Sequence, residues 1–289
     1  MTDRPSLKVG LIGADIQLSK TPPMHMREGL AHGIDYSYEL IDIHARNEPE
    51  SALPQLLDEV QARGFAGVNI THPFKQHVIA HLDALSDDAR MLGAVNTVVF
   101  RDGKRTGHNT DWYGFHESFK RGLPDAKRNR ALLIGAGGAG VAVAHAALKL
   151  DIAHLDIFDQ DIGRARLLAE KLNERFGAVR AFAVDTPEQS LPDADGLIHA
   201  TPVGMPAHPG IPVSPHLLES RHWVADIVYM PLVTALLATA RDKGCRTLPG
   251  GGMAVFQAVG AFRLFAEREP DADRMSAHFK ELCEGEAAG

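Results

Sequence analysis

The segment Gly135-Ala136-Gly137-Gly138-Ala139-Gly140 constrains the fold of this 289-residue chain more than any other feature. It directly follows an apolar run, Ala131–Ile134, that is typical of a buried strand, and it opens an alanine-rich segment, 139–150, that is typical of a helix. Glycines at the first, third and sixth positions of such a loop allow a tight turn, close approach of a pyrophosphate and close packing of helix on strand. The next predicted strand ends at Asp159, where doubly wound folds place an acidic residue that binds the adenosine ribose. The pattern therefore predicts a Rossmann-type unit that binds a dinucleotide.

Strand-like and helix-like stretches alternate along nearly the whole chain, which predicts the α/β class with mostly parallel sheets. We expect two domains, because the length exceeds that of one typical small domain. An N-terminal α/β substrate domain comprises residues 1–110 and 250–289, and a Rossmann-type dinucleotide-binding domain comprises residues 111–249. The C-terminal helical segment is expected to pack back on the first domain. A helix is also expected over residues 75–85.

Composition restricts the partners that the chain can have. Hydrophobic residues make up 45% of the chain, charged residues make up 23%, and the formal net charge is −7, so no basic surface for nucleic acid or an anionic membrane is indicated. No apolar run approaches the roughly 18 residues of a membrane helix, and the N-terminus lacks the pattern of a signal peptide. Cys245 and Cys283 are too few for a disulfide framework. We therefore expect a cytoplasmic protein with no membrane or nucleic-acid partner, and either a monomer or a homodimer.

Three histidines in one segment raise the question of a metal site. His77 and His81 are four positions apart, and His72 precedes them. No third ligand follows at a convincing spacing. We therefore expect no metal.

Two ionisable side chains stand directly after strand-like runs, where the chain turns and a side chain can face a cleft. Lys75 ends the segment 69–75, and Asp111 ends the segment 109–111. An alcohol carbon gives up hydride only as its oxygen loses a proton, so a group must hold that oxygen. A lysine can donate to the oxygen or take its proton, and an aspartate can orient the lysine. The pair predicts reversible oxidation of an alcohol beside a nicotinamide, and it leaves open which residue is the formal base.

Four further polar residues, Asn69, Thr71, Asn96 and Asn109, stand at the ends of apolar strands of the first domain. Buried amides need hydrogen-bond partners. A ligand with several hydroxyl groups would supply them, which indicates a polyhydroxylated substrate.

The residues after the second strand of the Rossmann domain bear on cofactor choice. A carboxylate at Asp159 accepts hydrogen bonds from the ribose 2′-hydroxyl of NAD and repels the 2′-phosphate of NADP. Asp161 adds negative charge, and Arg164 is the one cation nearby that could face the adenine or offset the repulsion. The segment favours NAD, with NADP as the alternative.

With these residues in place, the chain resembles the shikimate dehydrogenase family over essentially its whole length, and within it the NAD-linked quinate/shikimate dehydrogenases. The motifs that carry the resemblance are Ser19-Lys20-Thr21-Pro22, Asn69 to Lys75, Gly93-Ala94-Val95-Asn96-Thr97, Asn109-Thr110-Asp111, the glycine loop, Ala200-Thr201-Pro202-Val203-Gly204-Met205, Asp226-Ile227-Val228-Tyr229, and Gly251-Gly252-Met253 with Gln257.

The resemblance implies a role for each matching position. Lys75 and Asp111 are the catalytic pair, Ser19 and Thr21 hold the substrate carboxylate, and the substrate lies in a cleft between the domains that closes by hinge motion. The residues implied to bind the ring hydroxyls are Asn69, Thr71, Asn96 and Gln257. The residues implied to bind the cofactor are Gly135, Ala136, Gly137, Gly138, Ala139, Asp159, Arg164, Thr201, Val203, Met205, Val228 and Gly251.

Two departures point to one branch of the family. Strict shikimate enzymes usually carry Ser-x-Ser where this chain has Ser19-Lys20-Thr21, and NADP-using members usually carry Asn-Arg-Thr where it has Asp159-Gln160-Asp161. Both favour the NAD-linked branch, which oxidises the ring hydroxyl of quinate or shikimate to the 3-dehydro product and often serves quinate catabolism. No arginine obviously meets the substrate carboxylate.

Three alternatives stay open. The first is a dehydrogenase of a related cyclic acid such as aminoshikimate. The second is the NADP-dependent shikimate dehydrogenase of the shikimate pathway, which serves aromatic amino acid biosynthesis. The third is a module that senses NAD without turnover, although such a module would be expected to lack Lys75 or Asp111.

Overall fold

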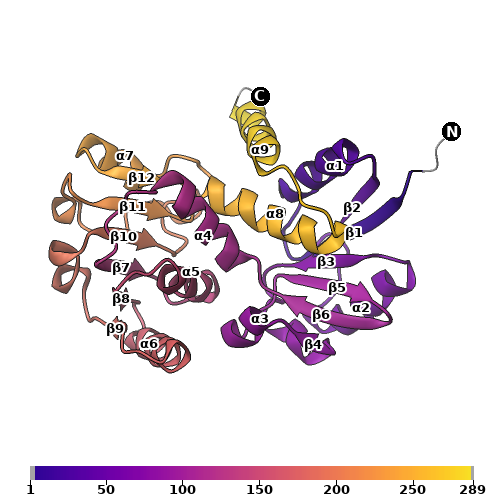
Figure 1. Ribbon diagram of the computed structural model, residues 1–289, viewed down its shortest axis with the longest axis horizontal. Coiled ribbons are helices and arrows are strands. Elements are labelled where there is room, and N and C mark those ends of the chain that lie inside the picture. Colours follow the sequence, from indigo (N-terminus) through magenta and orange to yellow (C-terminus); the bar gives the residue numbers. More distant parts are fainter. Residues whose placement is uncertain (1–3, 288–289) are drawn as a thin grey trace. The chain divides into compact units, whose positions relative to one another are not determined.

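The computed structural model describes residues 4–287, with side chains to residue 284. The chain forms two compact units, the first comprising Met1–Thr110 and Val255–Gly289 and the second comprising Asp111–Ala254. Each unit has its own six-stranded sheet with helices around it (Figure 1). Within residues 4–287, no helix is long and apolar enough to cross a membrane.

The sheet of the first unit brings four chain segments to one edge. Its order is β2-β1-β3-β5-β6-β4, with β1 parallel to β2 and β3, and β5 antiparallel to β3 and β6. The ends of β1 and β3 therefore lie beside the start of β5 and the end of β6. The strands are β1 (Ser6–Gly13), β2 (Asp35–Asp42), β3 (Gly67–Ile70), β4 (Ala84–Leu85), β5 (Thr97–Arg101) and β6 (Lys104–His108).

Helices cover both faces of this sheet. Leu57 and Val60 of α2 (Leu53–Ala62) pack on one face. The other face carries α1 (Thr21–Ala31) and α8 (Gly251–Ala266), whose Phe262 stacks on Tyr36 with ring centroids 5.3 Å apart. The last helix, α9 (Ala272–Ala287), packs on α1 through an ion pair of Arg274 with buried Glu28. The predicted return of the C-terminal helices to the first domain is confirmed.

The second unit has the strand order of a doubly wound nucleotide-binding fold. All its strands are parallel, in the order β12-β11-β10-β7-β8-β9. Taken from β9, this is the 3-2-1-4-5-6 order of the Rossmann fold, so the predicted fold class is confirmed. The strands are β7 (Arg130–Ile134), β8 (His154–Phe158), β9 (Ala181–Ala183), β10 (Gly196–His199), β11 (Trp223–Asp226) and β12 (Arg246–Leu248).

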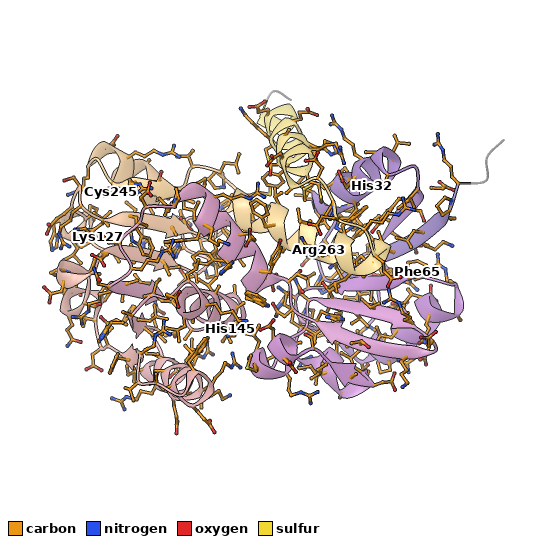
Figure 2. The ribbon with its side chains drawn as sticks, viewed as in Figure 1. His32, Phe65, Lys127, His145, Cys245 and Arg263 are labelled. Carbon is orange, nitrogen blue, oxygen red and sulfur yellow. The ribbon has the colours of Figure 1, made fainter. Side chains whose placement is uncertain are left out.

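The two faces of this sheet have separate cores. Helices α4 (Asp111–Gly122), α5 (Gly138–Lys149) and α6 (Ile162–Phe176) pack on one face. His145 of α5, labelled in Figure 2, lies fully buried in edge contact with Trp112 of α4. Helix α7 (Ala235–Asp242) packs on the other face through Leu236 and Leu237.

The helix predicted over residues 75–85 is wrong. The segment forms only a short 3-10 helix, His77–His81, and then turns into β4, because Leu82 is extended and Asp83 donates its backbone N–H to Arg105 at 2.9 Å. Pairing of β4 with β6 thus prevails over helix propensity. The unpredicted α3 (Asp87–Leu92) follows, with Ser86 as its N-cap.

Candidate active site

The ends of β1 and β3 are held together by a close contact at a glycine. Thr71 directly follows β3, and a Cβ atom on Gly13 at the end of β1 would lie 2.3 Å from the Thr71 methyl carbon. The next residues are also joined, since Ala14 donates its backbone N–H to the His72 carbonyl at 3.0 Å. Glycine at position 13 therefore leaves the space that Thr71 occupies.

Lys75 lies in the turn that follows β3 and is anchored through its neighbours. The preceding side chain, Phe74, is fully buried in the core under α2. The Lys75 carbonyl accepts the backbone N–H of Val95 at 2.7 Å. These contacts place half-buried Lys75 beside the segment that leads into β5.

A second set of hydrogen bonds joins the start of β5 to the chain after β6. The Asn96 side-chain oxygen accepts the backbone N–H of Thr110 at 2.7 Å, and its amide nitrogen donates to the Thr110 hydroxyl at 2.9 Å. Asn109 donates from its side-chain nitrogen to the Ala94 carbonyl at 3.0 Å. The protein itself thus supplies partners that we expected a ligand to supply, and it fixes the path of the chain up to Asp111.

Asp111 is the first residue of α4 and is buried, with 8% of its surface exposed. It is also the first residue of the second unit, whereas Lys75 belongs to the first. A carboxylate is favoured in the first turn of a helix by the helix dipole.

Asn69 is held on both sides of its amide group. The side-chain nitrogen donates to the Asn96 carbonyl at 3.2 Å and to the Thr97 hydroxyl at 3.0 Å. The side-chain oxygen accepts the phenol proton of Tyr38, on β2, at 2.8 Å. Asn69 is buried, with 4% of its surface exposed.

Ser19 and Thr21 stand at the beginning of α1, where the Ser19 hydroxyl accepts the backbone N–H of Thr21 at 3.4 Å. The loop before them is organised by Asp42, at the end of β2. One Asp42 oxygen accepts the backbone N–H of Asp15 at 3.1 Å, and the other accepts the backbone N–H of Ile16 at 3.0 Å. Burial opposes ionisation of Asp42, but hydrogen bonds from Gln17 and from this loop outweigh it and lower its pKa.

Gln257, the last predicted substrate residue, lies half-buried on α8 within the first unit. Ser19, Thr21, Asn69, Thr71, Asn96 and Lys75 also belong to that unit. The structure brings Asn69, Thr71, Asn96 and Lys75 to one edge of its sheet through the contacts above.

The glycine loop has the steric features that its motif predicts. Gly135 has a φ of +103°, and a Cβ there would lie 2.6 Å from the Ala200 carbonyl oxygen. A Cβ on Gly140 would lie 2.0 Å from the Gly135 carbonyl oxygen. At Gly137 and Gly138, by contrast, a Cβ would meet no atom of the described residues within 4 Å, apart from their chain neighbours and the backbone of α5. The loop is therefore packed at its two ends and open in the middle, where the N-terminus of α5 can receive a phosphate.

Asp159, just after β8, is bonded to this loop. One carboxylate oxygen accepts the backbone N–H of Ala136 at 2.7 Å, and the other accepts the backbone N–H of Asp161 at 2.9 Å. Arg164, on the first turn of α6, is exposed and forms an ion pair with Asp161 at 3.5 Å. Asp159 thus adjoins the open part of the loop with one further lone pair available on each oxygen.

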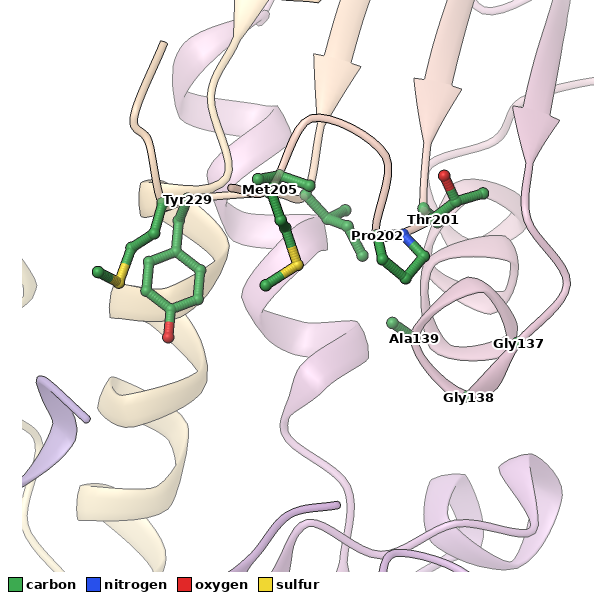
Figure 3. Close-up of a pocket in the computed structure, with 11 residues that line it drawn as sticks. Gly137, Gly138, Ala139, Thr201, Pro202, Met205 and Tyr229 are labelled. Atoms are coloured by element: carbon green, nitrogen blue, oxygen red, sulfur yellow. The ribbon is translucent and has the colours of Figure 1, made fainter. Parts of the chain in front are cut away.

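A cavity of about 390 Å³ lies over the C-terminal ends of the central strands of the second unit (Figure 3). Open α/β sheets bind ligands outside the C-terminal ends of their strands, at the point where the strand order reverses. The residues that line the cavity are Gly137, Gly138, Ala139, Ala200, Thr201, Pro202, Met205, Ile227, Val228, Tyr229 and Met230.

Six predicted cofactor residues are in this lining: three from the glycine loop, with Thr201, Met205 and Val228. Gly135, Ala136, Asp159, Arg164, Val203 and Gly251 are not among the lining residues. The sequence-based set omitted Ala200, Pro202, Ile227, Tyr229 and Met230. Their signal was available, because they directly follow strands β10 and β11, as Thr201 and Val228 do.

A buried hydrogen-bond network supports two walls of the cavity, and the sequence did not indicate it. Fully buried His199 lies between Asp226 Oδ1, 2.9 Å from His199 Nδ1, and the Thr201 hydroxyl, 2.5 Å from His199 Nε2. Asp226 also accepts the backbone N–H of Val228 at 3.0 Å and the Thr234 hydroxyl at 2.6 Å. In Figure 3 the Thr201 hydroxyl points away from Ala139, consistent with its use in this network. The network fixes the segments after β10 and β11 relative to each other.

Within the described part of the chain, no group of three or more His, Cys, Asp or Glu side chains could hold a metal ion. His72, His77 and His81 belong to no such group.

Known proteins resemble the chain in sequence and in structure. The family model described as shikimate dehydrogenase substrate binding domain matches residues 11–98. A shikimate dehydrogenase (NADP(+)) of Streptomyces avermitilis is 55% identical over 280 residues, 96% of each chain. A quinate/shikimate dehydrogenase (NAD(+)) of Corynebacterium efficiens is 47% identical over 96% of this chain and 99% of the relative.

The structure of quinate dehydrogenase from Corynebacterium glutamicum in complex with NAD matches with a TM-score of 0.91 and 46% identity, over 96% of this chain and 99% of that one. The likeness thus includes both units and the segments that carry the candidate site. On these identities and this coverage, the chain belongs to the shikimate dehydrogenase family.

Proposed function

We propose that this chain is an NAD-dependent quinate/shikimate dehydrogenase. The carbon that bears the ring hydroxyl gives hydride to the nicotinamide, the hydroxyl gives a proton to the protein, and the 3-dehydro ketone is the product. The observation that carries the proposal is the convergence of Asn69, Thr71, Asn96 and Lys75 at one sheet edge in a chain whose other unit holds a dinucleotide-type cavity.

Lys75 and Asp111 are the proposed catalytic pair. Lys75 holds the reacting oxygen and exchanges its proton, and Asp111 orients the lysine or shares the hydroxyl. Asn69, Thr71, Asn96 and Gln257 are proposed to bind ring hydroxyls, and the hydroxyls of Ser19 and Thr21 the carboxylate. The bonds of Asn96 to Thr110 support this arrangement, because they fix the chain directly before Asp111.

The second unit is proposed to bind the cofactor, which supplies the hydride acceptor when it is bound. The open middle of the glycine loop would receive the pyrophosphate, and Thr201, Met205 and Val228 would line the nicotinamide half together with Val203 and Gly251. The buried network of His199 and Asp226 holds Thr201 and Val228 in position.

NAD is the proposed cofactor on the basis of charge. The Asp159 carboxylate adjoins the glycine loop through Ala136 and retains lone pairs for the ribose hydroxyls. A 2′-phosphate would meet the negative charges of Asp159 and Asp161.

The second candidate is the NADP-dependent shikimate dehydrogenase. The Streptomyces avermitilis relative, at 55% identity, is named as NADP-dependent. Exposed Arg164 could also turn from Asp161 toward a phosphate. A related cyclic acid such as aminoshikimate fits the same residues, and a module that senses NAD without turnover is the remote alternative.

The proposal is tested by incubating the purified chain with quinate or shikimate and NAD, and identifying the product by its mass. The expected product is the substrate less two hydrogen atoms, and one molecule of it should form for each molecule of reduced cofactor. Tight binding of acid and NAD without product would instead support the sensing module.

The location in the cytoplasm and the monomeric or dimeric state stay predictions. The free thiols of Cys245 and Cys283 support the cytoplasmic location.

A further inference from the structure

We propose that Asn69 acts on the substrate only as a hydrogen-bond acceptor, so that the ring substituent facing it must be a donor, a hydroxyl or an amino group. The inference rests on the proposed function, which brings the substrate to Asn69. It goes further by fixing the polarity of one contact.

The orientation of the Asn69 amide is determined by a group that can only accept. The backbone carbonyl of Asn96 lies 3.2 Å from one end of the amide. A carbonyl oxygen has no proton to donate, so the nitrogen of Asn69 must face it. The reversed orientation would place two acceptor oxygens against each other in a buried position, which is costly.

Thr97 takes the second proton of this nitrogen. Its hydroxyl accepts from Asn69 at 3.0 Å and donates its own proton to the Asn96 side-chain oxygen at 3.0 Å. Thr97 is fully buried. Both protons on the Asn69 nitrogen are therefore used within the protein.

Tyr38 occupies one of the two lone pairs of the Asn69 oxygen. Its phenol oxygen lies 2.8 Å away and must donate, since the amide oxygen only accepts. Burial raises the pKa of Tyr38 well above its ordinary value, so the phenol keeps its proton at any working pH. The ring is held by edge contact with His25, with centroids 5.2 Å apart.

The remaining capacity of Asn69 is one lone pair on its oxygen. A substrate hydroxyl can donate to it, whereas an ether or fluorine at the same ring position would oppose it. A site of this polarity discriminates between ring substituents by whether they can donate a hydrogen bond, in addition to their size.

The test compares three substrates at each ring position remote from the reacting hydroxyl: the parent hydroxyl, its deoxy analogue and its fluoro analogue. At the position that faces Asn69 we expect kcat/KM to fall about three- to tenfold for the deoxy compound. The fluoro compound should be worse than the deoxy compound, because its fluorine faces an acceptor. A fluoro analogue that is better than the deoxy analogue at that position would overturn the inference.

Asn69→Ala identifies the position, because it should remove the difference between hydroxyl and deoxy substrates there and nowhere else. Tyr36→Phe is the matched control: Tyr36 lies on β2, as Tyr38 does, but its buried hydroxyl pairs with His25 rather than with Asn69. It should leave the order of the three substrates unchanged. The wild-type series decides the question even if Asn69→Ala does not fold. If kcat/KM of the fluoro analogue is not lower than that of the deoxy analogue at any ring position, the inference is overturned. Absence of turnover with both parent acids would instead refute the proposed function.

Discussion

Lys75 and Asp159 belong to different units of the chain, so chemistry and cofactor choice are separable at the level of single residues. Lys75→Ala removes the group proposed to exchange the proton, and we expect kcat to fall by about 10²- to 10⁴-fold. NAD affinity, measured by fluorescence titration, should be unchanged. Lys104→Ala, at an exposed position of β6, is the control and should retain full activity. A parallel loss of NAD affinity in Lys75→Ala would contradict this division.

Asp159→Asn removes charge but keeps an oxygen that can accept the backbone N–H of Ala136. We expect the ratio of kcat/KM with NADP to that with NAD to rise about tenfold or more, because the repulsion of the 2′-phosphate is reduced. Asp242→Asn, at an exposed position at the end of α7, is the control. An unchanged ratio would mean that the 2′ group is recognised elsewhere.

At the scale of elements, different glycines of the turn from β7 into α5 serve packing and cofactor binding. Gly140→Ala would place a Cβ 2.0 Å from the Gly135 carbonyl, and we expect it to lower the free energy of unfolding by about 2 kcal/mol or more. In Gly138→Ala the added Cβ meets no atom within 4 Å beyond its chain neighbours and the backbone of α5, so stability should be unchanged or slightly raised. NAD should nevertheless bind more weakly, because Gly138 lines the cavity. Thermal unfolding and NAD titration of both variants check this. Equal stabilities would contradict the packing role of Gly140.

The same turn shows what the sequence could predict. Glycine spacing directly after an apolar strand reflects local steric needs, and the structure has them at Gly135 and Gly140. The helix expected over residues 75–85 failed because pairing of β4 with β6, a long-range contact, decides that segment. The network of His199, Asp226 and Thr234 was not predictable either. His199 and Asp226 are 27 residues apart and meet only because β10 pairs with β11, and Thr234 joins them from the N-cap of α7.

At the scale of the whole molecule, the C-terminal helix α9 is joined to α1 of the same unit by the buried carboxylate of Glu28. Glu28 on α1 accepts two bonds from the Arg274 guanidinium, at 2.8 and 2.7 Å, and the backbone N–H of Asp271 at 2.8 Å. Burial opposes the charge of Glu28, but these partners outweigh it and lower its pKa below 4.5. The contribution of Glu28 to stability is therefore complete above pH 4.5 and is lost as the pH falls through the lowered pKa.

Glu28→Gln tests the contribution of this ion pair between α1 and α9. We expect a loss of about 2 kcal/mol near neutral pH, moderated because Arg274 is partly exposed, and a smaller loss relative to wild type in acid. Urea unfolding as a function of pH measures both. Glu188→Gln, at an exposed position of the second unit, is the control. A Glu28→Gln deficit that does not shrink in acid would contradict the assignment.

The whole chain resembles both NADP-dependent and NAD-dependent members of its family, so overall likeness does not decide the cofactor. The proposal of NAD rests instead on a local feature, the carboxylate of Asp159 beside the glycine loop. The most direct test is a steady-state assay of reduced cofactor formation with quinate and shikimate, each combined with NAD and NADP. We predict turnover of quinate and shikimate with NAD, and a higher kcat/KM with NAD than with NADP. Activity on shikimate alone, and only with NADP, would contradict the account and identify the NADP-dependent shikimate dehydrogenase.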